Sequence, residues 1–490
     1  MTHLPVLIVV APLLAAALIV LLNNRKVAWL ITLLTSLFCF YASVSMLEIL
    51  QEVDVISYTL GGWKAPFGIE LRIDALSALM LLILTGSALL VSIYALKSVE
   101  KEIPDKNQVL FYTALLMVLA GLIGISITGD AFNVFVFLEI SSLSTYALIS
   151  LGRDRRALHA SYQYLMMGTI GATFILIGIG FMYVMTGTLN IQDLSQRLPA
   201  VADTNAIRAA FAFITIGAGI KAAMLPLHQW LPNAYTYSPS VVSTFLAATA
   251  TKVAVYVMIR FELSLFGIEF SFLQIPFDKI LVILGTIGIL GGSIYAVYQN
   301  NVKRMLAYSS IAQIGYILLA IGLASQAGFT AALLHIFNHA LIKGTLFMAL
   351  GIVFFRFASA ELSIMAGIGK TMPLTMAAFT IGGLSLIGIP GTAGFVSKWY
   401  LVTALLDASL WPLALLILVA SVLTLIYVGR VIEVAYFRPT LKGESQLKVP
   451  KTMLIALWIF ALSNIYFGLN SDISMGVSTL AVNQLIGVAS

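Results

Sequence analysis

The stretch GIKAAMLPLHQWLPNAYTYSPSVVSTFLAATATKVAVY, residues 219–256, carries the features that decide the fold of this chain. Two lysines, Lys221 and Lys252, lie inside apolar runs, and three prolines separate the runs from one another. A proline inside a helix removes a backbone hydrogen bond. At membrane depth, backbone groups freed in this way are tolerated only where they are buried in protein or face a water-filled cavity. The stretch therefore predicts a broken membrane helix that is followed by a second, lysine-bearing helix.

The rest of the chain is equally apolar. It has 490 residues, of which 60% are hydrophobic and 10% are charged. Soluble domains carry about 25% charged residues, so this composition excludes them. Apolar runs of about 18 residues or more predict an all-α polytopic membrane protein with about fourteen spans, at residues 4–23, 27–48, 74–96, 109–127, 130–150, 162–186, 207–225, 239–260, 279–298, 304–323, 328–355, 373–406, 410–436 and 452–469.

Charge and cysteine content predict the orientation of the chain in the membrane and exclude some kinds of site. Lysines and arginines such as Arg25, Lys26 and Lys97 gather in alternate loops, which the positive-inside rule places in the cytoplasm. Both termini are then expected on the outer, periplasmic side, and the net charge of +6 needs no nucleic-acid partner. The first span is expected to be a retained helix and not a signal peptide. The single cysteine, Cys39, excludes a disulfide scaffold and a cysteine-ligated metal, so neither metal nor cofactor is expected.

Internal repetition suggests how the spans are organised. Residues 109–260, the fourth to eighth helices, and 279–436, the ninth to thirteenth, each place a lysine and a Pro/Gly interruption in a late span. Five is an odd number of spans, so the second copy would be inverted in the membrane, as in inverted-repeat transporters. Residues 1–108 would add three N-terminal helices, and 437–490 a fourteenth helix and a tail. Chance similarity between hydrophobic segments is the alternative.

Ionisable side chains inside the predicted spans are the candidate functional residues. Each costs on the order of 2.5–3.5 kcal/mol on insertion scales, so a chain that only spans the membrane would not keep them. Lys343 lies close to a basic loop, and a lysine near a helix end can instead extend its amine to the membrane surface. The candidates are Glu139, Lys221, Lys252, His335, His339, Lys343 and Lys398.

The spacing of the eleventh span suggests what these groups do. His335, His339 and Lys343 are at i, i+4 and i+8, so they share one helix face. Histidine exchanges protons near neutral pH, and a line of such groups resembles a proton wire with water between its members. Packing of the two histidines against a neighbouring helix is the simpler alternative. A metal site is less favoured, because no obvious carboxylate or cysteine completes the ligand set.

The twelfth span contains a second interruption. The stretch GIPGTAGFVSK, residues 388–398, places Pro390 and two glycines directly before Lys398. A break at this point would bring water to Lys398, which we expect to be the group that releases the proton. The glycine-rich stretch GTIGILGG, residues 285–292, is expected to allow close helix packing.

Several of these motifs resemble one known family. FVFLEISSLSTYAL (135–148), the stretch 219–256, VKRMLAYSSIAQIGYILLAIG (302–322), HIFNHALIKGTLFMALG (335–351) and GIPGTAGFVSKW (388–399) are similar to the antiporter-like subunits shared by respiratory complex I, membrane-bound hydrogenases and Mrp-type cation/proton antiporters. The chain most resembles the D subunit of Mrp antiporters. The resemblance covers nearly the whole chain, from about residue 74 to 436.

The resemblance implies a fold and a set of roles. It implies fourteen helices in two inverted five-helix bundles, with the seventh and twelfth helices broken. Glu139 matches the fifth-helix glutamate of the family, and Lys221 matches its seventh-helix partner. Lys252 matches the eighth-helix lysine of the family. His335 and His339 match its eleventh-helix relay, and Lys398 matches the terminal lysine of its twelfth helix. The M-type subunit of complex I has a glutamate at this last position, so Lys398 argues against that branch.

The implied function is proton translocation in a multi-subunit monovalent cation/proton (Na⁺/H⁺) antiporter of a prokaryotic cell membrane, with other membrane subunits as partners and no enzymatic activity of its own. As a hypothesis, a tight Glu139–Lys221 pair keeps the lysine protonated, and separation of the pair releases the proton toward Lys252. Two alternatives stay open: a proton-pumping subunit of a complex I-like oxidoreductase or membrane-bound hydrogenase, and a self-sufficient solute transporter.

Overall fold

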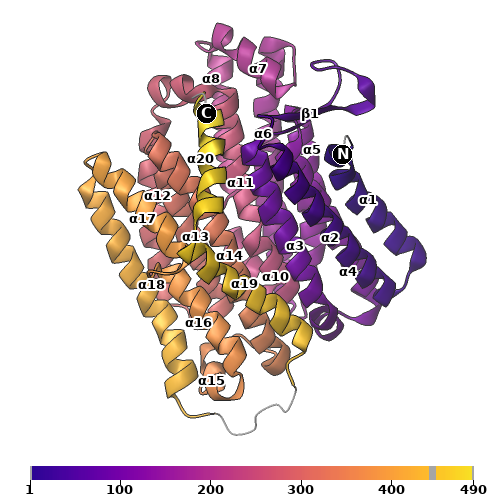
Figure 1. Cartoon of the computed structure of the whole chain (residues 1–490), viewed down its shortest axis with the longest axis vertical. Coiled ribbons are helices and arrows are strands. Elements are labelled where there is room, and N and C mark those ends of the chain that lie inside the picture. Colours follow the sequence, from indigo (N-terminus) through magenta and orange to yellow (C-terminus); the bar gives the residue numbers. More distant parts are fainter. Residues whose placement is uncertain (1–2, 441–447, 488–490) are drawn as a thin grey trace.

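The computed structural model describes residues 3–440 and 448–487. Most of them lie in helices that run roughly along the long axis of the molecule, and both chain ends lie toward the same end of the bundle (Figure 1). Within the described ranges, twelve helices are long and apolar enough to cross a membrane. The prediction of an all-α polytopic membrane protein is therefore confirmed.

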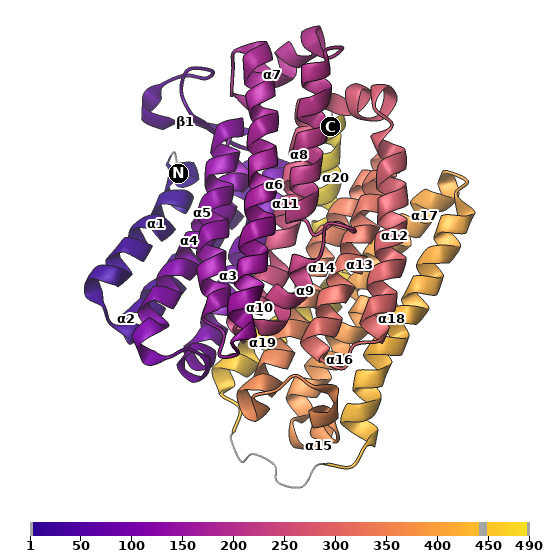
Figure 2. The same ribbon diagram turned by 180° about the vertical axis from the view of Figure 1, so that it is seen from behind.

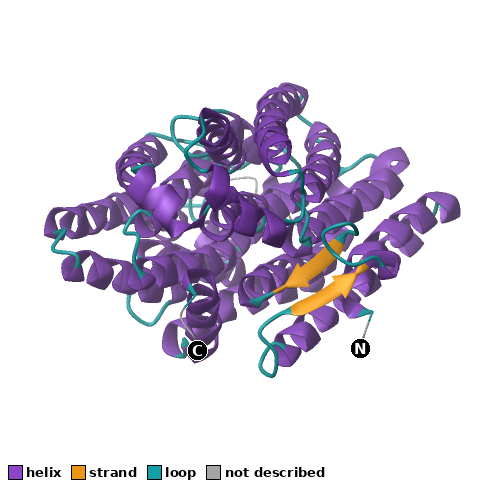
Figure 3. Cartoon of the chain, turned by 90° about the horizontal axis from the view of Figure 1, so that it is seen from above, coloured by secondary structure: helices purple, strands orange, loops and turns teal. Residues whose placement is uncertain are grey.

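The bundle begins with three helices and a short hairpin, in the order α1 (Leu4–Leu22), α2 (Arg25–Ile49), β1 (Ile56–Thr59), β2 (Glu70–Ile73) and α3 (Ala75–Glu102). The strands pair antiparallel, and seen from above they lie beside the N-terminus (Figure 3). The hairpin was not predicted from the sequence. Side-chain caps begin two of these helices: Asn24 accepts hydrogen bonds from the first turn of α2, and Asp74 accepts one from Ser77 in α3. Such caps satisfy backbone N–H groups that a first helical turn leaves unpaired.

The next helices pass through the region of the predicted fourth to eighth spans. They are α4 (Gln108–Ile127), α5 (Ala131–Ser150), α6 (Arg156–Thr186), α7 (Ile191–Arg197), α8 (Asn205–Lys221), α9 (Trp230–Tyr237), α10 (Ser240–Ala248) and α11 (Ala250–Ile259). Two π-helical turns, Arg260–Leu265 and Glu269–Gln274, follow α11. The predicted seventh span is thus broken between α8 and α9, as the prolines indicated. The predicted eighth span is also interrupted, at Thr249, which the sequence analysis did not foresee.

The region of the predicted ninth to thirteenth spans forms a second set of helices. They are α12 (Phe277–Val297), α13 (Val302–Ile321), α14 (Gln326–Phe357), α15 (Ile368–Thr371), α16 (Pro373–Ile387), α17 (Ala393–Asp407) and α18 (Trp411–Phe437). The predicted twelfth span is therefore two half-helices, α16 and α17, and Gly388 ends the first of them in a left-handed conformation. Seen from behind, α12 and α18 lie along one edge of the bundle (Figure 2). The grouping of the helices into two inverted repeats stays a prediction.

The C-terminal region contains more structure than the predicted helix and tail. After α19 (Lys451–Leu469), the chain forms α20 (Asp472–Ile486), drawn yellow in Figure 1, which leads to the end of the bundle that also carries the N-terminus. Helix α20 packs against α3 and α14. It was missed because its 15 residues, with polar side chains among the apolar ones, do not form a long apolar run.

Close packing brings the central helices together. At Gly285 of α12, an added Cβ would lie 2.7 Å from the backbone nitrogen of Leu319 in α13, and at Gly315 of α13 it would lie 2.7 Å from the oxygen of Gly285. Only glycine permits this approach, so the expected packing role of the stretch 285–292 is confirmed at its first glycine. Helix α14 contacts α3, α10, α13, α16, α17, α19 and α20, and it carries three of the candidate residues.

Candidate functional site

The break after α8 exposes backbone groups, which side chains then satisfy. Helix α8 ends at Lys221, and the indole Nε1 of Trp230, at the start of α9, donates to the carbonyl oxygen of Ile220 at 2.9 Å. The Lys221 side chain is buried, and its Nζ donates to Ser142 Oγ in α5 at 2.7 Å. The interruption therefore holds a lysine in the protein interior and leaves its ammonium on a hydroxyl oxygen.

Glu139 lies one helical turn before Ser142 on α5, but it forms no ion pair with Lys221 within 4.0 Å in the described chain. Its Oε1 is buried and has no hydrogen-bond partner among the described residues. The two charges still interact electrostatically. The predicted pair is thus separated in this conformation, because Ser142 takes the position next to the ammonium. Gly168 of α6 provides room here, since an added Cβ would lie 3.4 Å from Lys221 Nζ.

A second lysine lies at the interruption between α10 and α11. Thr249 leaves the helical conformation, with φ −124° and ψ −60°, and its hydroxyl donates to Phe245 O at 2.6 Å. Lys252 is completely buried, and its Nζ donates to the carbonyl oxygen of Ala247, which lies within the interrupted turn. The break therefore supplies the acceptor for this lysine.

The two histidines and the lysine of α14 share one face, as their spacing predicted. The imidazole rings of His335 and His339 are nearly parallel, with centroids 6.1 Å apart. His335 has two partners: Gln313 Oε1 at 2.8 Å from Nε2, and Ser397 Oγ at 2.9 Å from Nδ1. With the Gln313 oxygen as acceptor, Nε2 carries the hydrogen and Nδ1 accepts from the serine hydroxyl. Both ring nitrogens of His339 are buried and have no partner among the described residues.

Lys343 does not extend to the membrane surface. It is completely buried, and its Nζ donates to Leu306 O at 2.8 Å and to Ser309 Oγ at 2.5 Å, both in α13. The alternative that this lysine reaches out from a helix end is therefore wrong. Lys343 lies one turn after His339 on the same face of α14, so it belongs to the buried polar group of this helix.

Lys398 lies at the break between α16 and α17. Its Nζ donates to the carbonyl oxygens of Leu386 at 3.1 Å and Ile387 at 2.8 Å, and to Ser421 Oγ of α18 at 3.2 Å. The first two oxygens belong to the last turn of α16, where carbonyl groups have no helical partner and the helix dipole favours a cation. Lys398 also lies 5.0 Å from the centre of the Tyr316 ring, which in turn contacts His335.

One chemical feature unites the four lysines. Each ammonium contacts backbone carbonyl or hydroxyl oxygens, and none has a carboxylate within ion-pair distance in the described residues. Loss of a proton from such a lysine breaks no ion pair. The described chain also contains no group of three or more histidine, cysteine or carboxylate side chains that could hold a metal ion. The arrangement is suited to holding and passing protons.

A polar cavity of about 430 Å³ lies at the opposite end of the bundle from the termini and was not predicted. Glu102 and Lys303 line this cavity, and both contact Ser240, which follows the lining residue Pro239. Glu102 accepts from the backbone nitrogen of Ser240 at 2.9 Å, and Lys303 donates to Ser240 Oγ at 3.2 Å. Ser240 begins α10, the helix that leads to Lys252. Glu102 lies beyond the predicted third span, which ends at residue 96, because α3 continues for six more residues.

Comparison with known proteins identifies the relatives of this chain. It is 40% identical to the N subunit of the NADH-quinone oxidoreductase of Desulforudis audaxviator, with 96% of each chain covered. It is 29% identical to the D subunit of the Na(+)/H(+) antiporter of Bacillus subtilis, covering 96% of this chain and 95% of that one.

A solved structure agrees with these relatives. One chain of the membrane-bound sulfane sulfur reductase, an archaeal respiratory membrane complex, matches with a TM-score of 0.89 at 31% identity, over 99% of this chain and 98% of that chain. Residues 128–424 match the family described as NADH:quinone oxidoreductase/Mrp antiporter, TM. They include every candidate residue from Glu139 to Lys398. The chain therefore belongs to the NADH:quinone oxidoreductase/Mrp antiporter transmembrane family.

Proposed function

We propose that this chain is the proton-translocating subunit of a multi-subunit monovalent cation/proton antiporter, with Na⁺ as the exchanged cation. We place it in a prokaryotic cell membrane, with the lysine-rich loops in the cytoplasm and both termini outside. The observation that carries the proposal is the set of buried lysines at helix breaks, each held by neutral oxygens and linked by the two histidines of α14.

The proton path follows the order of these groups through the bundle. A proton passes from Lys221 to Lys252, then by His339 and His335 to Lys398. His339 is suited to the middle position because its ring nitrogens have no protein partner among the described residues, and buried polar groups of this kind normally bond to water. His335 leads toward the last lysine through Ser397, which accompanies Lys398 on α17. Lys343, one turn beyond His339 on the same face of α14, is a further member of this relay.

Glu139 acts as the switch at the start of the path. When its carboxylate approaches Lys221, the lysine keeps its proton, because a nearby negative charge favours the charged form. The separated arrangement, in which Ser142 holds the ammonium, corresponds to the state in which the proton can leave. The membrane potential supplies about 2.3 kcal/mol per charge per 100 mV, which is comparable to the effect of bringing one charge toward another in the protein interior.

Partner subunits are part of the proposal. Glu139 is only partly buried, and Leu143, one turn later on the same helix, is 55% exposed. The Oε1 atom of Glu139 is buried, but the rest of the side chain reaches the surface of α5, and contact of an ionisable side chain with lipid at this depth is energetically costly. We therefore place a neighbouring membrane subunit against this face of α5, where its approach would move Glu139 relative to Lys221.

A redox-driven complex is the second candidate. The 40% identical relative is named as a subunit of an NADH-quinone oxidoreductase, and this observation favours the alternative. The same proton path would then be driven by electron transfer in other subunits. A self-sufficient solute transporter is less favoured, because the relatives described above are named as subunits of larger systems.

The two candidates differ in a direct experiment. The complex is purified through a tag on this chain, reconstituted in liposomes and exposed to a Na⁺ gradient, while a pH-sensitive dye reports proton movement. We expect Na⁺-dependent proton movement that disappears in Lys221→Ala. Purification with iron–sulfur subunits, together with no response to Na⁺, would instead establish the redox-driven complex.

A further inference from the structure

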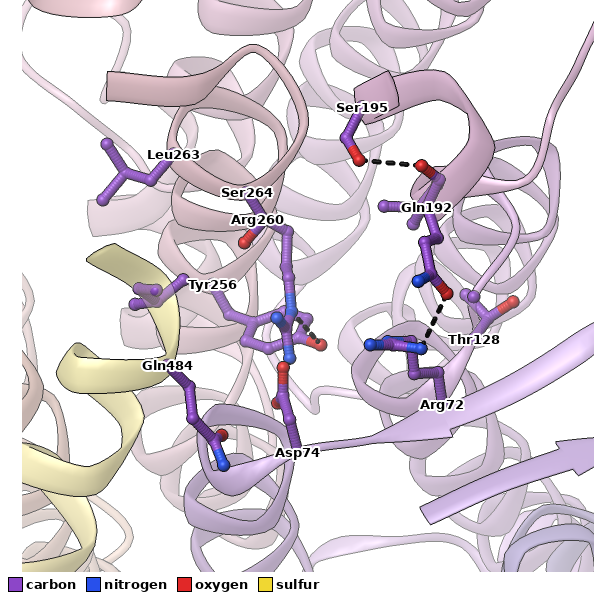
Figure 4. Close-up of a pocket in the computed structure, with 13 residues that line it drawn as sticks. Arg72, Asp74, Thr128, Gln192, Ser195, Tyr256, Arg260, Leu263, Ser264 and Gln484 are labelled. Carbon is purple, nitrogen blue, oxygen red and sulfur yellow. Dashed lines mark hydrogen bonds and ion pairs between the residues drawn. The ribbon is translucent and has the colours of Figure 1, made fainter. Parts of the chain in front are cut away.

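A second polar cavity, of about 210 Å³, lies at the end of the bundle that carries both termini. Segments far apart in the sequence form its walls (Figure 4). Arg72, Thr128 and Gln192 line one side, while Asp74, Tyr256 and Arg260 lie opposite. This cavity is distinct from the one beside Glu102, which lies at the other end of the molecule.

A compact hydrogen-bonded network forms the floor of this cavity. The Arg260 guanidinium forms an ion pair with Asp74 and donates to Ser77 Oγ at 2.9 Å and to Tyr256 Oη at 2.9 Å. Tyr256 donates to the carbonyl oxygen of Ser126 at 2.6 Å. Asp74 and Arg260 side chains are each only 15% exposed. These contacts join α3, α4 and α11 and close the cavity toward the interior.

The floor continues along the helix face that carries Lys252. Lys252, Tyr256 and Arg260 are at i, i+4 and i+8, so they lie on one face of the same helical segment. Each step of four residues along a helix spans about 6 Å. Two such steps, or about two turns, separate Lys252 from Arg260. Ser77 is completely buried beside Tyr256. Tyr256 and Arg260 therefore line the helix face between Lys252 and the cavity, while the Lys252 ammonium itself lies toward the break, on Ala247 O.

The helical segment that carries these side chains is interrupted at both ends. Before Lys252, the helix breaks at Thr249, and after Tyr256 it becomes a π-helical turn that begins at Arg260. Turns of this kind occur mostly as single bulges and frequently at functional sites. A shift of the ten residues of α11 would move Arg260, which follows them directly, relative to Asp74 at the N-cap of α3.

We propose that this cavity is the mouth of a second access path, through which Lys252 exchanges protons with the solution on the side of the termini, and that the Asp74–Arg260 ion pair is its gate. The proposal rests on the proposed proton-carrying role of Lys252. With the gate open, the Lys252 ammonium gives its proton to a water molecule and keeps the electron pair of the N–H bond as a neutral amine. The resulting hydronium ion leaves through the cavity. Arg260 moves aside and releases no proton, because arginine stays charged in proteins.

The gate responds to conformation and not to pH near neutrality. Arg260 stays charged in proteins, and its guanidinium holds Asp74 through the ion pair while it also donates to Ser77 and Tyr256. Opening thus requires movement of α11.

Cysteine accessibility tests the path without measuring transport. Cys39 is the only cysteine, so Cys39→Ala provides a cysteine-free background. Ser77→Cys is placed at the floor of the cavity and Lys252→Cys at the inner end of the path. The charged, membrane-impermeant thiol reagent MTSET is then added to one side of vesicles that contain the whole complex. Each cysteine is compared with and without Arg260→Gln.

We expect Arg260→Gln to accelerate modification of both cysteines at least tenfold, only from the side that carries the termini. Ser87→Cys, a buried position deeper in α3, is the matched control and should not change. If Arg260→Gln prevents assembly, Asp74→Asn opens the same pair while its amide oxygen still caps α3. No acceleration, or equal acceleration at position 87, would overturn the proposal. Proton exchange in the unmodified complex is measured separately, so failure of the gate and failure of the proposed function give different results.

Discussion

Lys398→Arg separates a proton-releasing role of Lys398 from a structural one. Three oxygens hold the Lys398 ammonium, two of them carbonyl oxygens in the last turn of α16. Arginine preserves the positive charge and the donors at this break. It is effectively always charged, however, whereas a group that releases a proton must become neutral once in each cycle.

The expected loss of proton exchange in Lys398→Arg follows from this requirement. At pH 7.5 the neutral fraction of an ordinary arginine is on the order of 10⁻⁶, so exchange through the substituted side chain should fall below detection. Lys398→Ala should also inactivate the complex, but it removes both the group that releases the proton and the donor that holds the helix break. It leaves the carbonyl groups of Leu386 and Ile387 without their donor, and each buried unsatisfied group costs about 1–3 kcal/mol. The alanine variant is therefore expected to lose roughly 2–6 kcal/mol of stability from these two groups, which makes arginine the cleaner test.

The assay compares Na⁺-driven proton movement in inverted vesicles that contain equal amounts of each assembled complex. Lys279→Arg is the matched control, because Lys279 lies at the start of α12, outside the buried core, and should tolerate the same substitution. Activity of Lys398→Arg above about half of the unmodified level would refute the reasoning. Lys398 would then anchor the broken helix and would not belong to the proton path.

Further substitutions test the remaining groups of the path. Glu139→Ala and Lys221→Ala should each abolish exchange while the complex still assembles, and normal exchange in assembled Glu139→Ala would eliminate the switch. Lys252→Ala should impair transport severely and His339→Ala more mildly, since water can bridge the gap left by the imidazole; vesicle assays that give the opposite order would contradict the order of the path. Gly168→Ala should reduce both thermal stability and exchange, because its Cβ would overlap the Tyr146 hydroxyl of α5 and lie 3.4 Å from Lys221 Nζ; an unchanged melting temperature would show that α6 can move away.

Residues that act through local chemistry were predictable. The long apolar runs predicted the membrane helices, and the prolines after Lys221 and before Lys398 predicted the two half-helix breaks, because a proline acts on its own helical turn. The i, i+4, i+8 spacing placed His335, His339 and Lys343 on one face. The break at Thr249 was not predicted, since neither proline nor glycine marks it.

Contacts between helices were not predictable. Ser142 takes the place of Glu139 beside Lys221 in a way that depends on the rotation of α5 and α8 about their axes. Helices that are apolar on every face give no periodic signal for such a rotation. Glu102 was missed for a related reason, since its partner Ser240 begins a helix far along the chain.

The sequence by itself determined the membrane class, the succession of helices, the breaks at proline and glycine and the presence of ionisable groups at membrane depth, because these depend on composition and on the chemistry of a single turn. Only the tertiary structure decided which oxygen each lysine contacts, that the Glu139–Lys221 pair is open, and that Asp74 meets Arg260 across 186 positions of sequence. Those contacts depend on how helices tilt, rotate and pack against one another, and packing is a property of the whole bundle that no single segment encodes.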